Sequence, residues 1–105
     1  MMKVFNVRNS DVNREILTEN NRFKTIYFKF EEGKGLPNHS HNGFATIQIV
    51  SGKVSIEFKN GEKYELNDGD FLPFDARIEH NVIAQELSTV IVTIEKTPVI
   101  KSFNK

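Results

Sequence analysis

The 105-residue chain contains no cysteine and no tryptophan, and its cationic and anionic side chains balance at 14 each. The lack of cysteine excludes disulfides, thiolate metal ligands and thiol nucleophiles, and it ties the chain to no oxidising compartment. The charge balance supplies no net field toward nucleic acid or a membrane surface. No apolar run approaches the roughly 18 residues of a transmembrane helix, and residues 1–13 lack the apolar core of a signal peptide. We therefore expect a cytoplasmic protein with no nucleic-acid or membrane partner.

Short alternating runs of apolar and polar residues dominate the chain, and no stretch keeps a helical period. A chain of this length buries roughly 60–70% of its unfolded surface, enough for one domain with one core. The runs that predict strands are residues 3–7, 23–30, 44–50, 54–58, 64–66, 71–74, 80–84 and 89–94. Seven or so strands spaced about 8–12 residues apart are typical of a sandwich or barrel. The predicted fold is all-β, a small antiparallel double-sheet barrel without substantial helix.

Two details of the strand order follow from local chemistry. A three-residue turn with a left-handed Gly61 pairs Ile56 with Tyr64, whereas a two-residue turn would set polar against apolar residues. Pro73 cannot donate a ladder hydrogen bond, so its strand should lie at a sheet edge or a bulge. The polar stretch 9–22 allows one helical turn or a short strand, and the tail 95–105 allows a last edge strand or a loose end.

Two of the three histidines, His39 and His41, stand two residues apart, just before an apolar alternating run. On an extended backbone such residues share one face, about 6.6 Å apart at ~3.3 Å of rise per residue. Two imidazoles so placed can converge on one metal ion or one anionic ligand. Their parity matches that of Ala45, Ile47 and Ile49, the face expected to line the barrel.

Glycines stand at fixed distances from all three histidines of the chain, in the order Gly33-x5-His39-x-His41, then Gly52, then Gly69-x10-His80. This pattern resembles the two sequence motifs of the cupin superfamily, over about residues 26–94. The resemblance implies a small single-domain cupin of the conserved-barrel type, often a jelly roll. It also implies that His39, His41 and His80 bind one divalent metal inside the barrel, together with a motif glutamate.

The chain departs from the family pattern at that glutamate. The glutamate should lie seven residues before Gly52, and Ala45 stands there. Gln48 has the opposite parity, so it could replace the glutamate only if a bulge near residues 42–43 shifted the register. In the second motif the usual proline and glycine fall on Asp75 and Arg77. The histidine spacing is kept, while the fourth ligand and the turn chemistry are not.

The expected cofactor is one divalent metal, with zinc, nickel, iron, manganese and copper as the candidates. Three protein ligands plus water is the pattern of catalytic zinc, and imidazole also suits nickel, copper and iron. The alternative is that the histidines are remnants that hydrogen-bond each other or water in a polar pocket. The residues expected to line the pocket are Phe44, Ala45, Ile47 and Phe74.

Asp75, Arg77 and Glu79 lie just before His80. They could act in acid–base catalysis or hold a substrate carboxylate, or they could form a solvated loop. Glu79 is adjacent to His80, so it should point away from it on a regular strand.

Two functional classes remain open on the sequence. One is a stand-alone module that binds a small molecule, with or without a metal, and the missing glutamate favours it. The other is a metal-dependent oxygenase, isomerase or lyase that acts on a small polar or aromatic compound. A homodimer is expected in either case, and strand 3–7 could add to the sheet of a neighbouring copy or pair within its own chain.

Overall fold

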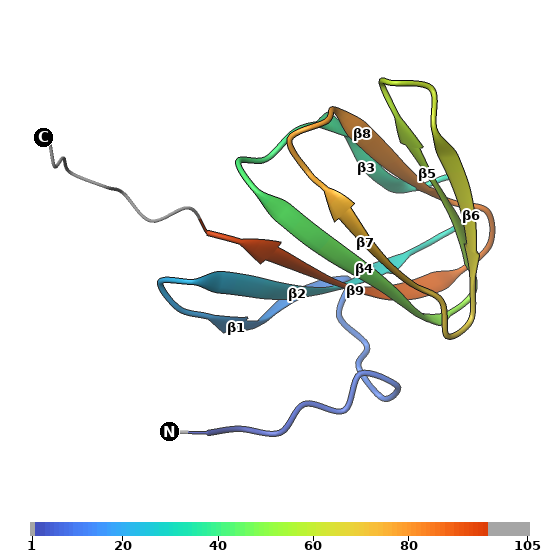
Figure 1. The fold of residues 1–105 in the computed structure, drawn as a ribbon. Helices are drawn as coiled ribbons and strands as arrows, with labels where there is room; N and C mark the ends of the chain where they lie inside the picture. The colour runs from blue at the N-terminus through green and yellow to red at the C-terminus, as the bar shows by residue number, and fades with distance from the viewer. Residues whose placement is uncertain (1, 97–105) are drawn as a thin grey trace, which may run out of the picture.

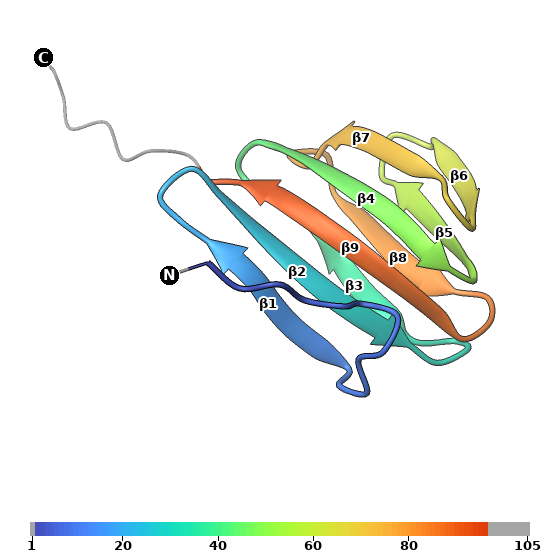
Figure 2. The same ribbon diagram turned by 90° about the horizontal axis from the view of Figure 1, so that it is seen from below.

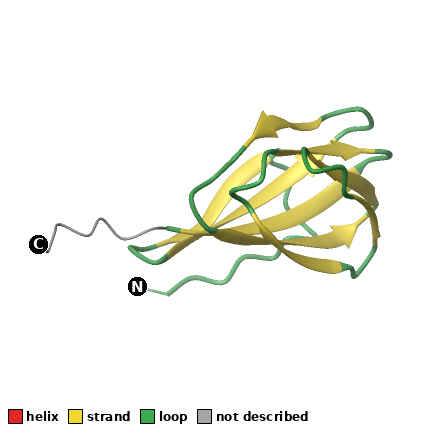
Figure 3. Ribbon diagram, turned by 45° about the horizontal axis from the view of Figure 1, so that its top comes forward, coloured by secondary structure: helices red, strands yellow, loops and turns green. Residues whose placement is uncertain are grey.

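The computed structural model describes residues 2–96, and this part of the chain is built from strands and turns, without helix (Figure 3). Within it lie nine strands: β1 (Arg14–Glu19), β2 (Phe23–Phe30), β3 (Gly35–His39), β4 (Phe44–Ser51), β5 (Lys53–Phe58), β6 (Lys63–Asn67), β7 (Phe71–Asp75), β8 (His80–Ala84) and β9 (Ser88–Glu95). The all-β prediction is confirmed. Residues 2–96 also provide no helix that could span a membrane.

The strands form two antiparallel sheets that face each other (Figures 1 and 2). A five-stranded sheet has the order β1-β2-β9-β4-β7, and a four-stranded sheet has the order β3-β8-β5-β6. Within residues 2–96 the chain changes sheet six times, at β2–β3, β3–β4, β4–β5, β6–β7, β7–β8 and β8–β9. This is the double-sheet barrel of jelly-roll type that the sequence predicted.

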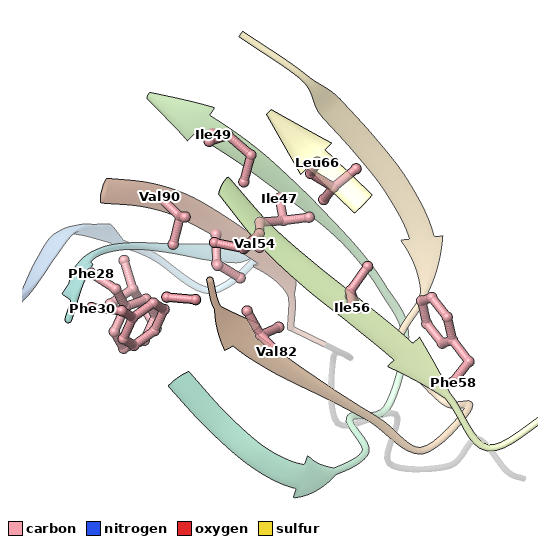
Figure 4. Packing of buried hydrophobic residues seen from close by; sticks show 13 residues of the cluster. Phe28, Phe30, Ile47, Ile49, Val54, Ile56, Phe58, Leu66, Val82 and Val90 are labelled. Carbon is pink, nitrogen blue, oxygen red and sulfur yellow. The ribbon is translucent and has the colours of Figure 1, made fainter. Parts of the chain in front are cut away.

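The core fills the space between the sheets, because alternate residues of each strand point inward. One row runs across the five-stranded sheet through Ile26, Val92, Ile47 and Leu72, which pair in register. Figure 4 shows the aliphatic centre of this core meeting Phe28 and Phe30 on one side and Phe58 on the other. The predicted inward face is confirmed, since Ala45, Ile47 and Ile49 are all buried.

The hairpin between β5 and β6 has the predicted register. Ile56 pairs with Tyr64 and Val54 pairs with Leu66. Gly61 has a φ of 98°, which a side-chain-bearing residue rarely adopts, and its N–H donates to the Phe58 carbonyl over 2.9 Å. Apolar side chains therefore stay on one face through the turn.

Three sequence-based expectations concern the edges of the sheets. Pro73 lies in β7, the edge strand of the five-stranded sheet, as predicted. Residues 3–7 form no strand, and the edge beside β2 is taken instead by β1 in the polar stretch 9–22. The expectation for residues 3–7 as a strand of this chain's own sheet is therefore wrong. The tail beyond residue 96, for which the sequence allows a last edge strand or a loose end, lies outside the described residues.

Candidate functional site

Two of the predicted ligands meet where β3 ends and β8 begins. His39 is the last residue of β3, His80 is the first residue of β8, and the two are partners in the antiparallel ladder. Their ring centroids are 4.4 Å apart and the ring planes are inclined by 59°. The four-stranded sheet thus brings the histidines of the two motifs together at one end.

The two rings are held in the same way. Nδ1 of His39 lies 2.8 Å from the Pro37 carbonyl oxygen, and Nδ1 of His80 lies 2.7 Å from the Ile78 carbonyl oxygen. A carbonyl oxygen can only accept, so each Nδ1 carries the proton in the neutral ring. The lone pair is then on Nε2, and neither Nε2 has a hydrogen-bond partner within residues 2–96. A backbone bond of this kind is how proteins orient imidazoles that ligate metals.

Aromatic rings enclose His80. The side chain is 3% exposed, with the Phe58 ring 5.5 Å away and the Phe74 ring 5.1 Å away, centroid to centroid. Burial lowers the pKa of His80, and the nearby His39 and His41 lower it further, while the hydrogen bond to Ile78 acts in the opposite direction. The ring is therefore neutral at pH 7. His39, by contrast, is exposed, so the pair has one buried and one open member.

His41 does not share a strand face with His39, which corrects the expectation from their spacing. β3 ends at His39, and the chain then crosses toward the five-stranded sheet. The His41 N–H donates to the Ala76 carbonyl over 2.8 Å, and Nε2–H of its ring donates to the Glu95 carbonyl over 2.8 Å. Residues i and i+2 point to the same face only along a continuous strand. Here β3 ends at His39, before His41 is reached.

Glu95, which no sequence pattern marks, holds the segment between β3 and β4 at both of its ends. Its carbonyl accepts from His41, and its carboxylate Oε1 accepts from the Phe44 N–H over 2.9 Å. Gly43 passes against the same carboxylate with a φ of 143°, and an added Cβ would lie 2.7 Å from Oε1. Glu95 is the last residue of β9, far from His41 in the sequence, so no local pattern could have identified the contact.

Gln48 does not take the place of the missing glutamate. Ala45 is 5% exposed and faces the core, whereas Gln48 is exposed on the opposite face of β4. The register of β4 is regular where it matters, because the pairs from Phe44 to Gln48 follow β7 without a shift and Gln48 stays on the outer face. Phe74, the partner of Ala45 in β7, is one of the two phenylalanine rings that pack against His80.

The four residues expected to line a pocket divide between two places. Phe44, Ala45 and Phe74 line a cavity of about 480 Å³ at the end of the five-stranded sheet, together with Thr25 and Thr93. Phe44 is 56% exposed there, beneath the Arg77 guanidinium at 5.1 Å. Ile47 is 1% exposed and belongs to the core.

The charged residues before His80 pair with other side chains. Arg77 donates two hydrogen bonds to the Asp75 carboxylate, over 2.8 and 2.7 Å. These bonds lower the pKa of Asp75 to about 2, so Asp75 carries no proton to donate at neutral pH. Glu79 lies 3.8 Å from the Lys59 ammonium. The arrangement is that of a solvated loop and provides no acid–base pair.

A divalent metal suits two of the three histidines as they stand. His39 and His80 each offer an oriented Nε2, while His41 has its Nε2–H on the Glu95 carbonyl. Across residues 2–96, no group of three or more His, Cys, Asp or Glu side chains is placed to hold an ion together. We call His39 and His80 the histidine pair.

The fold and the paired motif histidines define the class. The chain belongs to the cupin family, since a family model described as a cupin domain matches residues 26–94.

Solved structures with the same fold come from diverse bacteria and from an archaeon. An RmlC-like cupin from Desulfovibrio desulfuricans is 27% identical, with a TM-score of 0.81 over 94% of this chain and 100% of the other. KdgF from Halomonas sp. is also 27% identical, with a TM-score of 0.70 over 80% of this chain and 79% of the other. An RmlC-like cupin from Methanocaldococcus jannaschii is 15% identical, with a TM-score of 0.76 over 91% and 92% of the two chains, and it supports the fold alone. A search of curated proteins gives no match.

Proposed function

We propose that this protein is a small cupin module that binds a small molecule at the histidine pair, with a divalent metal as the bridge to the ligand. The observation that carries the proposal is the shared anchoring of the two rings. Each Nδ1 is bound to the carbonyl two residues earlier, at 2.8 Å for His39 and 2.7 Å for His80. Each Nε2 is thereby left as a neutral donor to a metal or an acceptor for a polar ligand.

His39 and His80 would hold the metal, and His41 would join them only by giving up its bond to Glu95. All three donors are imidazoles, which favours zinc, nickel, copper or iron over manganese. When bound, such an ion supplies a Lewis acid for a ligand oxygen. The exposed side of His39 leaves room for that ligand, while Phe58 and Phe74 shield His80 from water.

The surrounding side chains favour binding over turnover. A proton-transfer catalyst needs a group within reach whose pKa lies near the working pH. Asp75 is ion-paired with Arg77 and has a pKa of about 2, and Glu79 is directed to Lys59. We therefore propose a binding role for the pair.

Metal content of the native protein tests the proposal. Protein grown with added zinc, nickel and iron should carry close to one divalent ion per chain by mass spectrometry. The His39→Ala/His80→Ala variant should carry less than about one tenth of that amount. Lys63→Ala, a change on the exposed strand β6, is the matched control and should retain the metal. Equal, sub-stoichiometric metal in all three proteins would contradict a metal-bridged site.

The small-molecule ligand can be identified by a binding screen with the metal-loaded protein. A panel of small diols and keto acids should include compounds that raise the thermal midpoint of the parent but not that of the double variant. Oxygen consumption or product formation with the same panel would replace the binding role by an enzymatic one. The homodimer and the cytoplasmic location stay predictions, and light scattering during gel filtration checks the first.

A further inference from the structure

A second cavity lies away from the histidine pair, on the outer face of the five-stranded sheet. It measures about 180 Å³ and is formed where the N-terminal segment, through Arg8 and Ser10, covers strands β2, β9 and β4. Figures 1 and 2 both show this segment running along the outer side of the sheet, near β1 and β2. We propose that this cavity is a binding site for a small oxyanion, such as phosphate or a short carboxylate.

The floor of the cavity follows from the register. Lys29 of β2, Thr89 of β9 and Ser51 of β4 form one row across the sheet. Tyr27, two residues before Lys29, points to the same outer face. The row presents one ammonium and two hydroxyl groups, and the Ser51 and Thr89 hydroxyls are hydrogen-bonded to each other over 2.8 Å.

Tyr27 carries the strongest sign of a ligand. Tyr27 is 0% exposed although it lies on the outer face of the sheet, and its hydroxyl has no hydrogen-bond partner among residues 2–96. Leaving a buried hydroxyl unpaired costs about 1–3 kcal/mol, and native structures contain few such groups. Tyr27 is one of the residues that line the cavity, so an oxyanion bound there would supply the missing acceptor once the buried hydroxyl turns toward it.

The charges in the lining favour an anion. Arg8 and Lys29 are both in the wall, and none of the lining residues carries a carboxylate. Arg8 forms no ion pair within residues 2–96. Lys29 uses one of its three N–H groups on the Ser10 carbonyl, over 3.1 Å, which fixes the segment to the sheet. Glu15, the cross-strand partner of Tyr27 in β1, is not part of the lining.

The size limits the ligand. A water molecule takes about 30 Å³ of liquid volume, so a cavity of 180 Å³ has room for a phosphate, sulfate or acetate ion and little more. Drug-sized molecules occupy pockets of about 300–1,000 Å³. The site is independent of the proposed metal site, since it lies on the opposite face of the sheet from the core.

Titration of the full chain with sodium phosphate tests the inference, with sodium chloride at matched ionic strength as the reference. Backbone amide spectra should show saturable shifts at Tyr27, Lys29 and Thr89 with phosphate and none that saturate with chloride. Sodium acetate is the second arm, and a saturable response to it instead would identify a carboxylate as the preferred oxyanion. Shifts that stay linear with both anions, at the size seen with chloride, would overturn the inference.

Two variants separate ligand binding from a structural role of the same residues. Tyr27→Phe keeps the packing and removes the orphan hydroxyl, so the phosphate-free protein should unfold at the same or a higher temperature than the parent. Phosphate binding should nevertheless weaken by about tenfold in Tyr27→Phe and in Arg8→Ala, as expected for hydrogen bonds to a charged group. Lys63→Ala removes one positive charge from the other sheet and should bind phosphate as the parent does. Equal binding by the parent and Tyr27→Phe would overturn the assignment.

Discussion

The histidine pair and His41 come from one sequence pattern, but the backbone holds them differently. His39 and His80 each bond through Nδ1 to a carbonyl two residues away, so each ring is set by its own local chain. His41 bonds through Nε2 to Glu95, at the end of a strand far away in the sequence. The difference lies in the end of β3, which includes His39 and excludes His41.

An imidazole ring can therefore be oriented in two ways, by a carbonyl of its own local chain or by a strand that is distant in the sequence. A ring that is oriented by a local hydrogen bond keeps its orientation as long as its own strand is formed. A ring that is oriented by a distant strand depends on the whole sheet and can exchange its partner when a ligand competes. The pair is therefore the fixed part of the site, and His41 is the adjustable part.

Removal of Phe58 should have the largest effect. Phe58 is 5% exposed and its ring contacts His80 at 5.5 Å and Phe74 at 5.6 Å. Phe58→Ala should lower the free energy of unfolding by about 3–5 kcal/mol, measured by urea denaturation. Phe44→Ala is the matched control, because Phe44 is 56% exposed, and it should cost only about 0.5 kcal/mol. Similar losses in the two variants would mean that the rings around His80 are not a packed support.

The second-largest effect is expected on metal affinity, which should differ between variants of the histidine pair and a variant of His41. Loss of an outer-shell partner costs 10–100-fold in metal affinity, so loss of either ligand of the pair should cost about 100-fold. His39→Ala and His80→Ala should behave alike in zinc competition titrations. His41→Ala should lose about tenfold or less, because its ring is engaged by Glu95. Equal losses in all three variants would favour a symmetric three-histidine site and contradict a distinction between the histidine pair and His41.

The pH dependence of folding should separate buried His80 from exposed His39. Burial lowers the pKa of His80 below its usual 6.5. As the pH falls below 6.5 the unfolded chain takes up the proton first, so the free energy of unfolding declines until the lower folded-state pKa is passed. The decline is at most about 1.4 kcal/mol per pH unit. In metal-free protein, His80→Gln should remove most of it and His39→Gln should not. Parallel pH profiles for the parent and His80→Gln would contradict the burial argument.

The smallest effect is expected at the Asp75–Arg77 pair, which lies beside the site without supporting it. Arg77 holds the pKa of Asp75 at about 2 through side-chain hydrogen bonds. The contribution of this pair to stability is present above the ordinary pKa of 3.8 and is lost as the pH falls toward 2. Arg77→Gln should return the carboxyl titration, followed by carbon NMR, toward 3.8 and leave the His80 titration unchanged. Lys59→Gln, the control, should leave Asp75 unchanged, and a shift of His80 in Arg77→Gln would link the loop to the site.

Much of the fold could be predicted from the sequence because it is encoded by local alternation. The apolar parity of residues 54–58 and 64–66 set the hairpin register, and Pro73 marked an edge strand. The sequence allowed a helical turn as well as a short strand where β1 lies, and β3 was not predicted. Both segments are mostly polar and β3 contains Pro37, so neither shows clean alternation. Their pairing is decided by the neighbouring strands β2 and β8.

The candidate site could be predicted only as far as the resemblance to the motifs reaches. The resemblance to the cupin motifs implied that His39 and His80 lie together, and the structure pairs them. The orientation of His41 depends on Glu95, and the aromatic enclosure of His80 depends on three strands that meet only in the folded protein. The Tyr27 cavity gave no sign in the sequence, because Tyr27 reads as an ordinary strand residue until the N-terminal segment covers it.

The protonation of the three imidazole rings tests the central contrast most directly. Long-range proton–nitrogen NMR spectra of the metal-free protein at pH 7.5 distinguish a ring that carries its proton on Nδ1 from one that carries it on Nε2. The structure predicts the Nδ1–H form for His39 and His80, because each donates to a backbone carbonyl, and the Nε2–H form for His41. The Nε2–H form at His39 or His80, or one common form in all three rings, would contradict the account of the histidine pair.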